Sequence, residues 1–120
     1  MAQPVLLVED DVETRESFRF VLESGGYGVV TAENGQQALD ALRQGLTPCL
    51  ILLDLMMPVV DGFQFRQRQL EDPHLAAIPV VACSGHFDSD ATRLRAAAYF
   101  QKPVDVDQLL QVVGSYCDRR

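Results

Sequence analysis

The sequence lacks a surplus of basic residues, and its N-terminus lacks an apolar run long enough to enter a membrane. Its 10 Lys and Arg residues stand against 17 Asp and Glu residues, which gives a net charge of −7 at pH 7. This charge repels phosphate backbones and anionic lipid head groups. The N-terminal apolar run covers only positions 5–8, and no basic segment precedes it. We therefore expect no nucleic-acid binding and no membrane insertion.

Cysteine is also scarce, and its spacing excludes the common metal-binding and redox motifs. The three cysteines, Cys49, Cys83 and Cys117, are an odd number, and none belongs to a C-x-x-C pair. Two of them lie within apolar runs, where a thiol behaves as a small hydrophobic side chain. This pattern predicts reduced thiols in a cytoplasmic protein.

The chain has no internal repeat and no low-complexity linker. Its 120 residues, 48% of them hydrophobic, suffice for one continuous core. We expect a single domain that spans residues 1–120, with no output domain encoded in this sequence.

Short apolar runs alternate with segments of helical periodicity. The runs predict strands at residues 5–8, 27–32, 49–53, 78–83 and 99–101. The helices are predicted after Asp11, after Asn34–Gly35, from Gly62, over residues 90–98 and over residues 105–116. Because the strands read as continuous apolar runs, both faces of the sheet should be covered. The predicted fold is an α/β three-layer sandwich with a five-stranded parallel sheet and five helices.

Polar residues follow four of these apolar strands. Glu9 and Asp10 come after the first strand, Asp54 after the third, Ser84 after the fourth and Lys102 after the fifth. Right-handed crossovers place the carboxyl ends of parallel strands at one edge, where ligands bind. Clustered carboxylates repel one another, and their oxygen ligands favour Mg²⁺ as the compensating cation.

Such a site suits an incoming phosphoryl group. Asp54 is the best candidate for the nucleophile because it follows the most central apolar run, and the product would be an acyl phosphate. Each residue also has a simpler interpretation on its own. Glu9 and Asp10 could cap a helix, Ser84 could be a turn hydroxyl, and Lys102 could be a solvated lysine; their joint placement favours the site.

With these polar residues at the strand ends, the sequence resembles the receiver domain of the response regulators of two-component signal transduction, which are typical of bacteria. The matching segments cover residues 6–11, 52–62, 84–85 and 99–103. The resemblance implies the flavodoxin-like strand order 2-1-3-4-5. It also implies that Asp54 is the phosphoacceptor, that Asp10 binds Mg²⁺ directly and Glu9 through water, and that the backbone carbonyl of Met56 completes the metal site together with Asp54.

The resemblance assigns further roles near the carboxyl ends of the last two strands. Ser84 and Lys102 would sense the phosphoryl group, and the Gly85 backbone amide would contact it. Tyr99 would act as an aromatic switch, although its simpler role as a core residue stays open. Pro103 would follow a cis peptide bond.

One interval departs from the family pattern. Ser84 and Lys102 are 18 positions apart, which is shorter than usual by about one helical turn, roughly four residues. We therefore expect a shortened fourth helix. The usual dimer surface of the family includes this helix, so a monomer or weak dimer is expected.

The expected activity is regulatory: a phosphoacceptor that catalyses its own phosphorylation and slow dephosphorylation. The donor would be a sensor histidine kinase, a histidine phosphotransfer protein or a small phosphodonor, and the downstream partner is unknown. The alternatives are a phosphorelay shuttle, a phosphate sink and a pseudo-receiver that only binds partners. An aspartyl-phosphate hydrolase is disfavoured because such an enzyme needs a second acid two residues after the nucleophile, and Met56 stands there. An FMN-binding protein of similar architecture is disfavoured because no phosphate-binding loop follows the first strand.

Overall fold

The computed structural model describes residues 2–55, 61–85 and 95–118. Within these ranges a five-stranded parallel sheet has the order β2-β1-β3-β4-β5. The strands are β1 (Val5–Val8), β2 (Val29–Ala32), β3 (Leu50–Asp54), β4 (Val80–Ser84) and β5 (Ala98–Gln101). Both the fold class and the strand order predicted from the sequence are confirmed.

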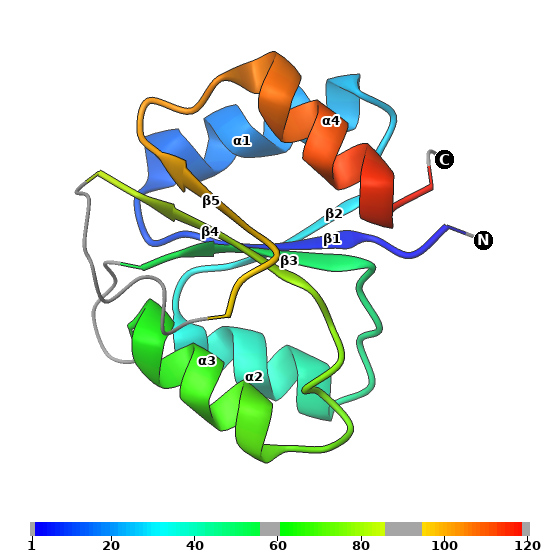
Figure 1. Cartoon of the computed structure of the whole chain (residues 1–120), viewed down its shortest axis with the longest axis vertical. Coiled ribbons are helices and arrows are strands. Elements are labelled where there is room, and N and C mark those ends of the chain that lie inside the picture. Colours follow the sequence, from blue (N-terminus) through cyan, green and yellow to red (C-terminus); the bar gives the residue numbers. More distant parts are fainter. Residues whose placement is uncertain (1, 56–60, 86–94, 119–120) are drawn as a thin grey trace.

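The described residues include four helices, which cover both faces of the sheet. The helices α1 (Val12–Ser24) and α4 (Val106–Tyr116) lie on one face, and α2 (Gly35–Arg43) and α3 (Gly62–Glu71) lie on the other (Figure 1). An aspartate or asparagine caps the N-terminus of every one of these helices, because its side chain accepts a hydrogen bond from a backbone N–H of the first turn. The caps are Asp11, Asn34, Asp61 and Asp105.

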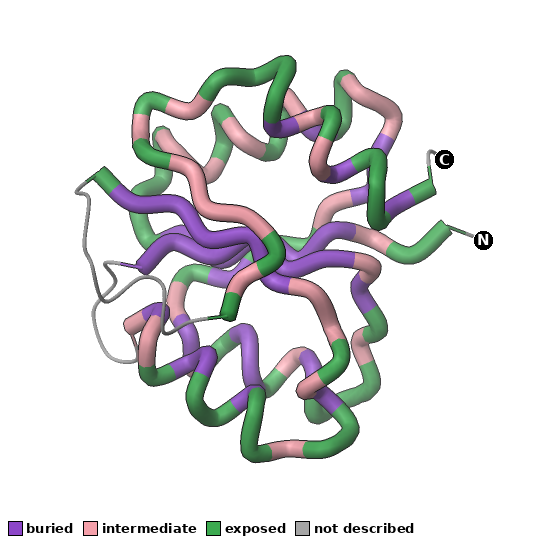
Figure 2. The backbone as a smooth tube through the Cα atoms, viewed as in Figure 1, coloured by how far each residue is buried: buried purple, intermediate pink, exposed green. Residues whose placement is uncertain are grey.

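The sheet divides the core into two apolar layers. Alternate residues of β1 point to opposite faces, so that Leu6 and Val8 pack under α2 and α3 while Val5 and Leu7 pack under α1 and α4. The central strands β1, β3 and β4 are buried along their whole length, and Figure 2 shows them between more exposed helices. This burial explains why the sequence contains continuous apolar runs.

The ends of β3 and β4 differ from the prediction by one position. Asp54 and Ser84 are the last residues of these strands and are buried, whereas the apolar runs alone placed them in the following loops. The register pairs Asp54 with Cys83 and Ser84 with Gln101. The sheet backbone therefore holds both polar side chains at its carboxyl edge.

The expected fourth helix at residues 90–98 lies mostly outside the described residues. Its C-terminal end was predicted wrongly, because residues 95–97 are not helical and Ala98 already belongs to β5. Arg95 has a positive φ of 53°, and the Ala97 N–H donates to the Val80 carbonyl oxygen (2.8 Å). Pairing with β4 thus begins where helix was expected. The helix labelled α4 is the last helix of the chain, which the sequence predicted at residues 105–116.

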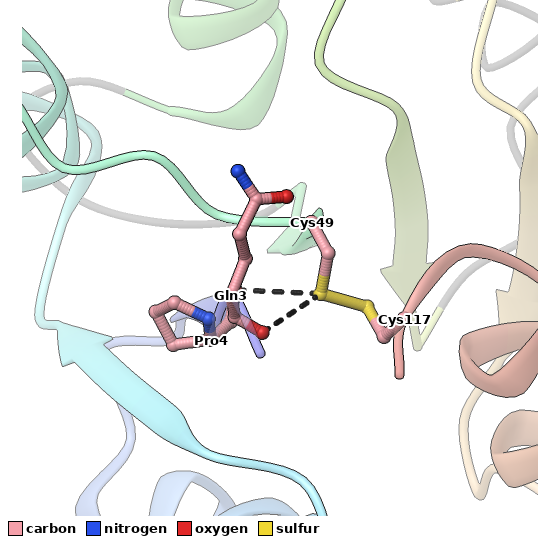
Figure 3. Close-up of a disulfide and its surroundings, with 4 residues drawn as sticks. All are labelled: Gln3, Pro4, Cys49 and Cys117. Atoms are coloured by element: carbon pink, nitrogen blue, oxygen red, sulfur yellow. Dashed lines mark hydrogen bonds between the residues drawn. A yellow bond between two sulfur atoms is a disulfide. The ribbon is translucent and has the colours of Figure 1, made fainter. Parts of the chain in front are cut away.

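The prediction of three reduced thiols is also wrong for two of the cysteines. Cys49 and Cys117 form a disulfide with a Cα–Cα distance of 5.4 Å (Figure 3). The two positions are 68 residues apart in sequence, and they meet because the end of α4 reaches the beginning of β3. Cys83 is a free, buried thiol, as predicted.

None of the helices in residues 2–55, 61–85 and 95–118 has the length and apolar character that a membrane crossing requires.

Candidate functional site

Three carboxylates meet at the carboxyl edge of the sheet. Glu9 and Asp10 follow β1, and Asp54 ends the neighbouring β3. One carboxylate oxygen from each residue lies within 4.8 Å of the other two. The side chains of Glu9 and Asp54 are only 2% and 7% exposed, and Asp10 is the least buried of the three. Buried carboxylates at this spacing repel one another strongly unless a cation lies close by.

Lys102 supplies one such cation from the end of β5. Its Nζ atom lies 2.7 Å from Glu9 Oε1 and 3.6 Å from Asp54 Oδ1. Because β4 separates β5 from β3, the long lysine side chain must span the end of β4 to reach both acids. A single ammonium group cannot balance three ionised carboxylates. The site therefore keeps an excess of negative charge that a divalent cation could neutralise.

The pKa shifts of this pair follow from burial and mutual attraction. Burial raises the pKa of Glu9, the hydrogen bond with Asp54 raises it further, and Lys102 offsets only part of this increase. Burial alone would lower the pKa of Lys102, but its hydrogen bond to Glu9 and the attraction of Asp54 outweigh that effect and raise it. Lys102 is therefore held in its protonated form.

The chemistry of the donor set fits Mg²⁺. All three side chains offer carboxylate oxygens, and Asp10 is accessible enough to leave room for the water ligands that Mg²⁺ retains. Nitrogen and sulfur ligands, which zinc and copper prefer, are absent from this cluster of described residues. Met56, the fourth expected ligand, lies outside the described residues.

The backbone around Glu9 has a support that the sequence interpretation missed. The Nη1 atom of Arg15 donates to the Glu9 carbonyl oxygen at 3.1 Å. Side chains in the first turn of a helix point back towards its N-terminus, so an arginine there can reach the end of the preceding strand. The Asp11 N–H also lies 3.4 Å from Glu9 Oε2.

Ser84, Gly85 and Pro103 lie beside this cluster. Ser84 is buried at the end of β4, and its carbonyl oxygen accepts a hydrogen bond from the Lys102 N–H at 2.7 Å. The Lys102–Pro103 peptide bond is cis, in the form that the resemblance implied. Gly85 is exposed directly after Ser84. The backbone thus fixes Ser84 and Lys102 side by side.

Tyr99 occupies β5 opposite Ala82 of β4. It is half-buried and packs against the core layer under α2 and α3. This packing agrees with the core role that the sequence left open for Tyr99. The switch role of Tyr99 stays a prediction.

A second missed feature is a buried arginine on α3. The side chain of Arg66 donates to Gln69 Oε1 (2.8 Å) and to the carbonyl oxygen of Arg95 (3.0 Å). Gln69 in turn donates to the carbonyl oxygens of Leu75 and Ile78, each at 2.9 Å. Burial, followed by repulsion from Arg95, lowers the pKa of Arg66. This network ties α3 to the segment that enters β5.

A groove of about 610 Å³ runs between α1 and α4 and adjoins the carboxylate cluster. Lys102 and Asp11 line it, and most of the rest of its lining is apolar. The apolar residues are Phe18, Val21, Pro103, Val104, Val106 and Leu109. We call this feature the α1–α4 groove. It offers an apolar surface directly beside a charged pocket.

The chain matches a family model described as the response regulator receiver domain over residues 5–114. It belongs to this family. Receiver domains are regulatory modules of two-component signalling and not enzymes in the classical sense. They generally bind Mg²⁺ in an acidic pocket and interact with histidine kinases or phosphotransfer proteins.

Relatives of this receiver domain match it over nearly the whole chain. The polar-differentiation response regulator DivK of Brucella anthropi is 33% identical, with 97% of each chain covered. A response regulator receiver protein from Pseudomonas putida has a TM-score of 0.87 at 28% identity, covering 96% of this chain and 98% of that one. The chemotaxis protein CheY4 of Vibrio cholerae, at 23% identity, shares the fold with a TM-score of 0.86, covering 97% and 99%.

Proposed function

We propose that this receiver domain accepts a phosphoryl group on Asp54 and that the resulting acyl phosphate changes a surface that includes β5. The observation that carries the proposal is the convergence of three carboxylate oxygens within 4.8 Å, with the Lys102 ammonium in contact with Glu9 and 3.6 Å from Asp54. A pocket with this charge arrangement suits the transfer of an anionic group only when cations compensate it.

Mg²⁺ is the proposed cofactor. The carboxylates of Glu9, Asp10 and Asp54, together with the backbone carbonyl of Met56, would hold it. When bound, the ion neutralises charge on the phosphoryl oxygens and allows an anionic nucleophile to approach an anionic donor. The excess negative charge of the cluster supports this assignment.

In the proposed reaction, an oxygen of the Asp54 carboxylate attacks the phosphorus atom. A bond forms between that oxygen and phosphorus, and the bond from phosphorus to the donor breaks, leaving its electron pair on the donor's histidine nitrogen or on the oxygen of a small phosphodonor. Lys102 stays protonated and stabilises charge on the phosphoryl oxygens. Later attack by water on phosphorus would release phosphate slowly and restore Asp54.

The signal would pass from Asp54 to β5 through Ser84. The Ser84 hydroxyl and the Gly85 N–H are the proposed additional donors to the phosphoryl group. The Ser84 carbonyl oxygen also accepts a hydrogen bond from the Lys102 N–H, so a displacement of Ser84 would be felt at the carboxyl end of β5, the strand that carries Tyr99. In this view the phosphoryl group favours one of two states by binding it better.

The α1–α4 groove supports a protein as the phosphodonor. Its apolar lining would pack against a helical partner, and its charged end at Lys102 would bring the donor's phosphohistidine close to Asp54. The donor proposed is a sensor histidine kinase or a histidine phosphotransfer protein, acting in the cytoplasm on a monomer or weak dimer. A phosphorelay shuttle or a phosphate sink would use the same chemistry.

The test is to incubate the protein with Mg²⁺ and acetyl phosphate and to measure its intact mass. We expect one acid-labile phosphoryl group per chain, and none when a chelator removes the metal. Asp54→Asn should abolish the uptake. Asp40→Asn is the matched control, because Asp40 is exposed on α2 and away from the carboxylate cluster. Full uptake by the Asp54 variant, or no uptake by the unmodified protein, would contradict the proposal.

A further inference from the structure

The Cys49–Cys117 disulfide lies at the amino edge of the sheet, opposite the carboxylate cluster. Cys49 directly precedes β3, and Cys117 directly follows α4. Figure 1 shows the two termini of the chain near this edge, whereas the arrowheads of β4 and β5 point the other way. The bond therefore connects the last helix to a central strand and takes no part in the phosphoryl site.

The bond adds a covalent anchor at the C-terminal end of α4. The inward residues Leu109 and Val113 pack α4 against the sheet, and Val113 already belongs to the last turn of the helix. At the end of the helix, Tyr116 is 46% exposed, and the Cys117 N–H donates to the Val113 carbonyl oxygen at 2.8 Å. No basic residue in the last turn stabilises the helix dipole. The disulfide is thus the covalent tether of this last turn, beside the packing of Val113 and the close approach of Gly114 to the Tyr27 hydroxyl.

The surroundings of Cys49 suit a thiol as well as a disulfide. Its Sγ atom lies 3.3 Å from the Gln3 carbonyl oxygen and 3.5 Å from that of Pro4 (Figure 3). A disulfide sulfur has no proton to donate, but a reduced thiol would find both acceptors in place. Reduction therefore leaves no unsatisfied buried donor at Cys49.

The accessibility of the two sulfur atoms determines which of them a small thiol attacks first in thiol–disulfide exchange. Cys49 is half-buried, whereas Cys117 is only 6% exposed, so an external thiolate reaches the Cys49 sulfur first. The remaining cysteine does not compete, because Cys83 is a free thiol that is only 2% exposed in the core. Two of the three cysteines thus form a defined pair.

We propose that Cys49 and Cys117 form a reversible redox-modification site for small thiols and disulfides of the glutathione class, which controls how firmly the last turn of α4 is held. Disulfides that occur in reducing compartments are usually transient or redox-sensing. The proposal is independent of phosphorylation.

The exchange balances in two steps. A thiolate attacks the Cys49 sulfur, the bond to Cys117 breaks, and the Cys117 thiolate takes a proton from water. A second thiolate then attacks the small thiol's sulfur in this mixed disulfide, which yields one small-molecule disulfide and the Cys49 thiolate, and the latter takes a proton from water. Two electrons pass from the two small thiols to the protein disulfide, and oxidation by the small disulfide reverses both steps.

The experiment uses the full chain in buffers with different ratios of reduced to oxidised glutathione. Alkylation followed by mass measurement counts the free thiols, and hydrogen exchange reports on the helix. We expect two thiols to appear and disappear reversibly as the ratio changes. On reduction, amides at residues 113–117 should exchange about tenfold faster or more, because local opening becomes easier, while β1 and β3 stay protected.

The variants separate the pair from other effects. In Cys49→Ser, the amides at residues 113–117 should exchange hydrogen as fast as in the reduced protein in every buffer. Cys83→Ala should behave like the unmodified protein. The proposal is wrong if the thiol count does not respond to the glutathione ratio, or if reduction leaves exchange at residues 113–117 unchanged. Loss of protection in β1 and β3 together with α4 would also overturn it, since that would mean global unfolding instead of release of one turn.

Discussion

Replacing Gly62 with alanine should disturb the phosphoryl site through the backbone. Gly62 is the first residue of α3, and its N–H donates to the Leu55 carbonyl oxygen at 3.1 Å. A Cβ atom added there would lie 2.6 Å from Leu55 Cα and 2.8 Å from the Asp54 carbonyl oxygen. Both neighbours are backbone atoms at the end of β3. The collision can therefore be relieved only by a backbone shift, either at the end of β3, which holds Asp54, or at the start of α3.

Overpacking of this kind costs about 1–3 kcal/mol, and the better helix propensity of alanine returns up to about 1 kcal/mol. We therefore expect Gly62→Ala to lower the free energy of unfolding by about 1–2 kcal/mol. For a chain of this size the melting temperature should fall by about 4–8 °C. Phosphorylation of Asp54 should also slow down.

Thermal unfolding followed by circular dichroism measures this effect, and Gly85→Ala is its matched control. Among the residues that the structure describes, a Cβ atom at Gly85 meets no atom within 4 Å, so this variant should stay within about 0.5 kcal/mol of the unmodified protein. The reasoning is refuted if Gly62→Ala melts at or above the temperature of the unmodified protein, or if both variants lose the same stability.

Three further changes test other parts of the structure. Glu9→Gln should raise the free energy of unfolding, measured in Mg²⁺-free urea titrations at neutral pH. Burial raises the pKa of Glu9 in the folded state, so the protonated side chain stabilises the fold below the ordinary glutamate pKa of 4.5, and this stabilisation is lost as the pH rises through the pKa of the folded state. Glutamine resembles the protonated side chain at every pH. A less stable variant at neutral pH would contradict this. Arg66→Met removes a buried cation together with its hydrogen bonds, and should lower the free energy of unfolding by about 1.5–3 kcal/mol in the same titration. The control Arg68→Ala changes an exposed residue and should stay within about 0.5 kcal/mol of the unmodified protein. Equal losses of stability would refute the special role of Arg66. Ser84→Ala should still be phosphorylated but should lose the phosphorylation-dependent change in hydrogen exchange at Ala98–Gln101; an undiminished change would exclude Ser84 as the relay.

Much of the fold and the pocket follows from local features of the sequence. Buried parallel strands need continuous apolar runs, so the runs located all five strands to within a few residues. The polar residues at their ends had to meet, because parallel strands place their carboxyl ends at one edge. Asp54 and Lys102 are 48 positions apart, yet the alternation of strands and helices was sufficient to bring them together.

Features that depend on one particular tertiary neighbour could not be predicted in this way. The partner of Cys49 lies 68 residues away, and nothing in the local pattern indicates that the end of α4 reaches the start of β3. Arg66 occupies a polar position of a helix, which normally faces solvent, but the segment entering β5 covers it. Arg15 also reads as an exposed helix residue and instead supports the Glu9 backbone.

The central claim, that Asp54 carries the phosphoryl group, is tested most directly by locating the modified residue. After phosphorylation with Mg²⁺ and acetyl phosphate, borohydride converts an acyl phosphate of aspartate into homoserine, which peptide sequencing by mass spectrometry identifies. We predict homoserine at position 54 and aspartate or glutamate retained at positions 9, 10 and 61. Homoserine at another position, or its absence from position 54, would contradict the account.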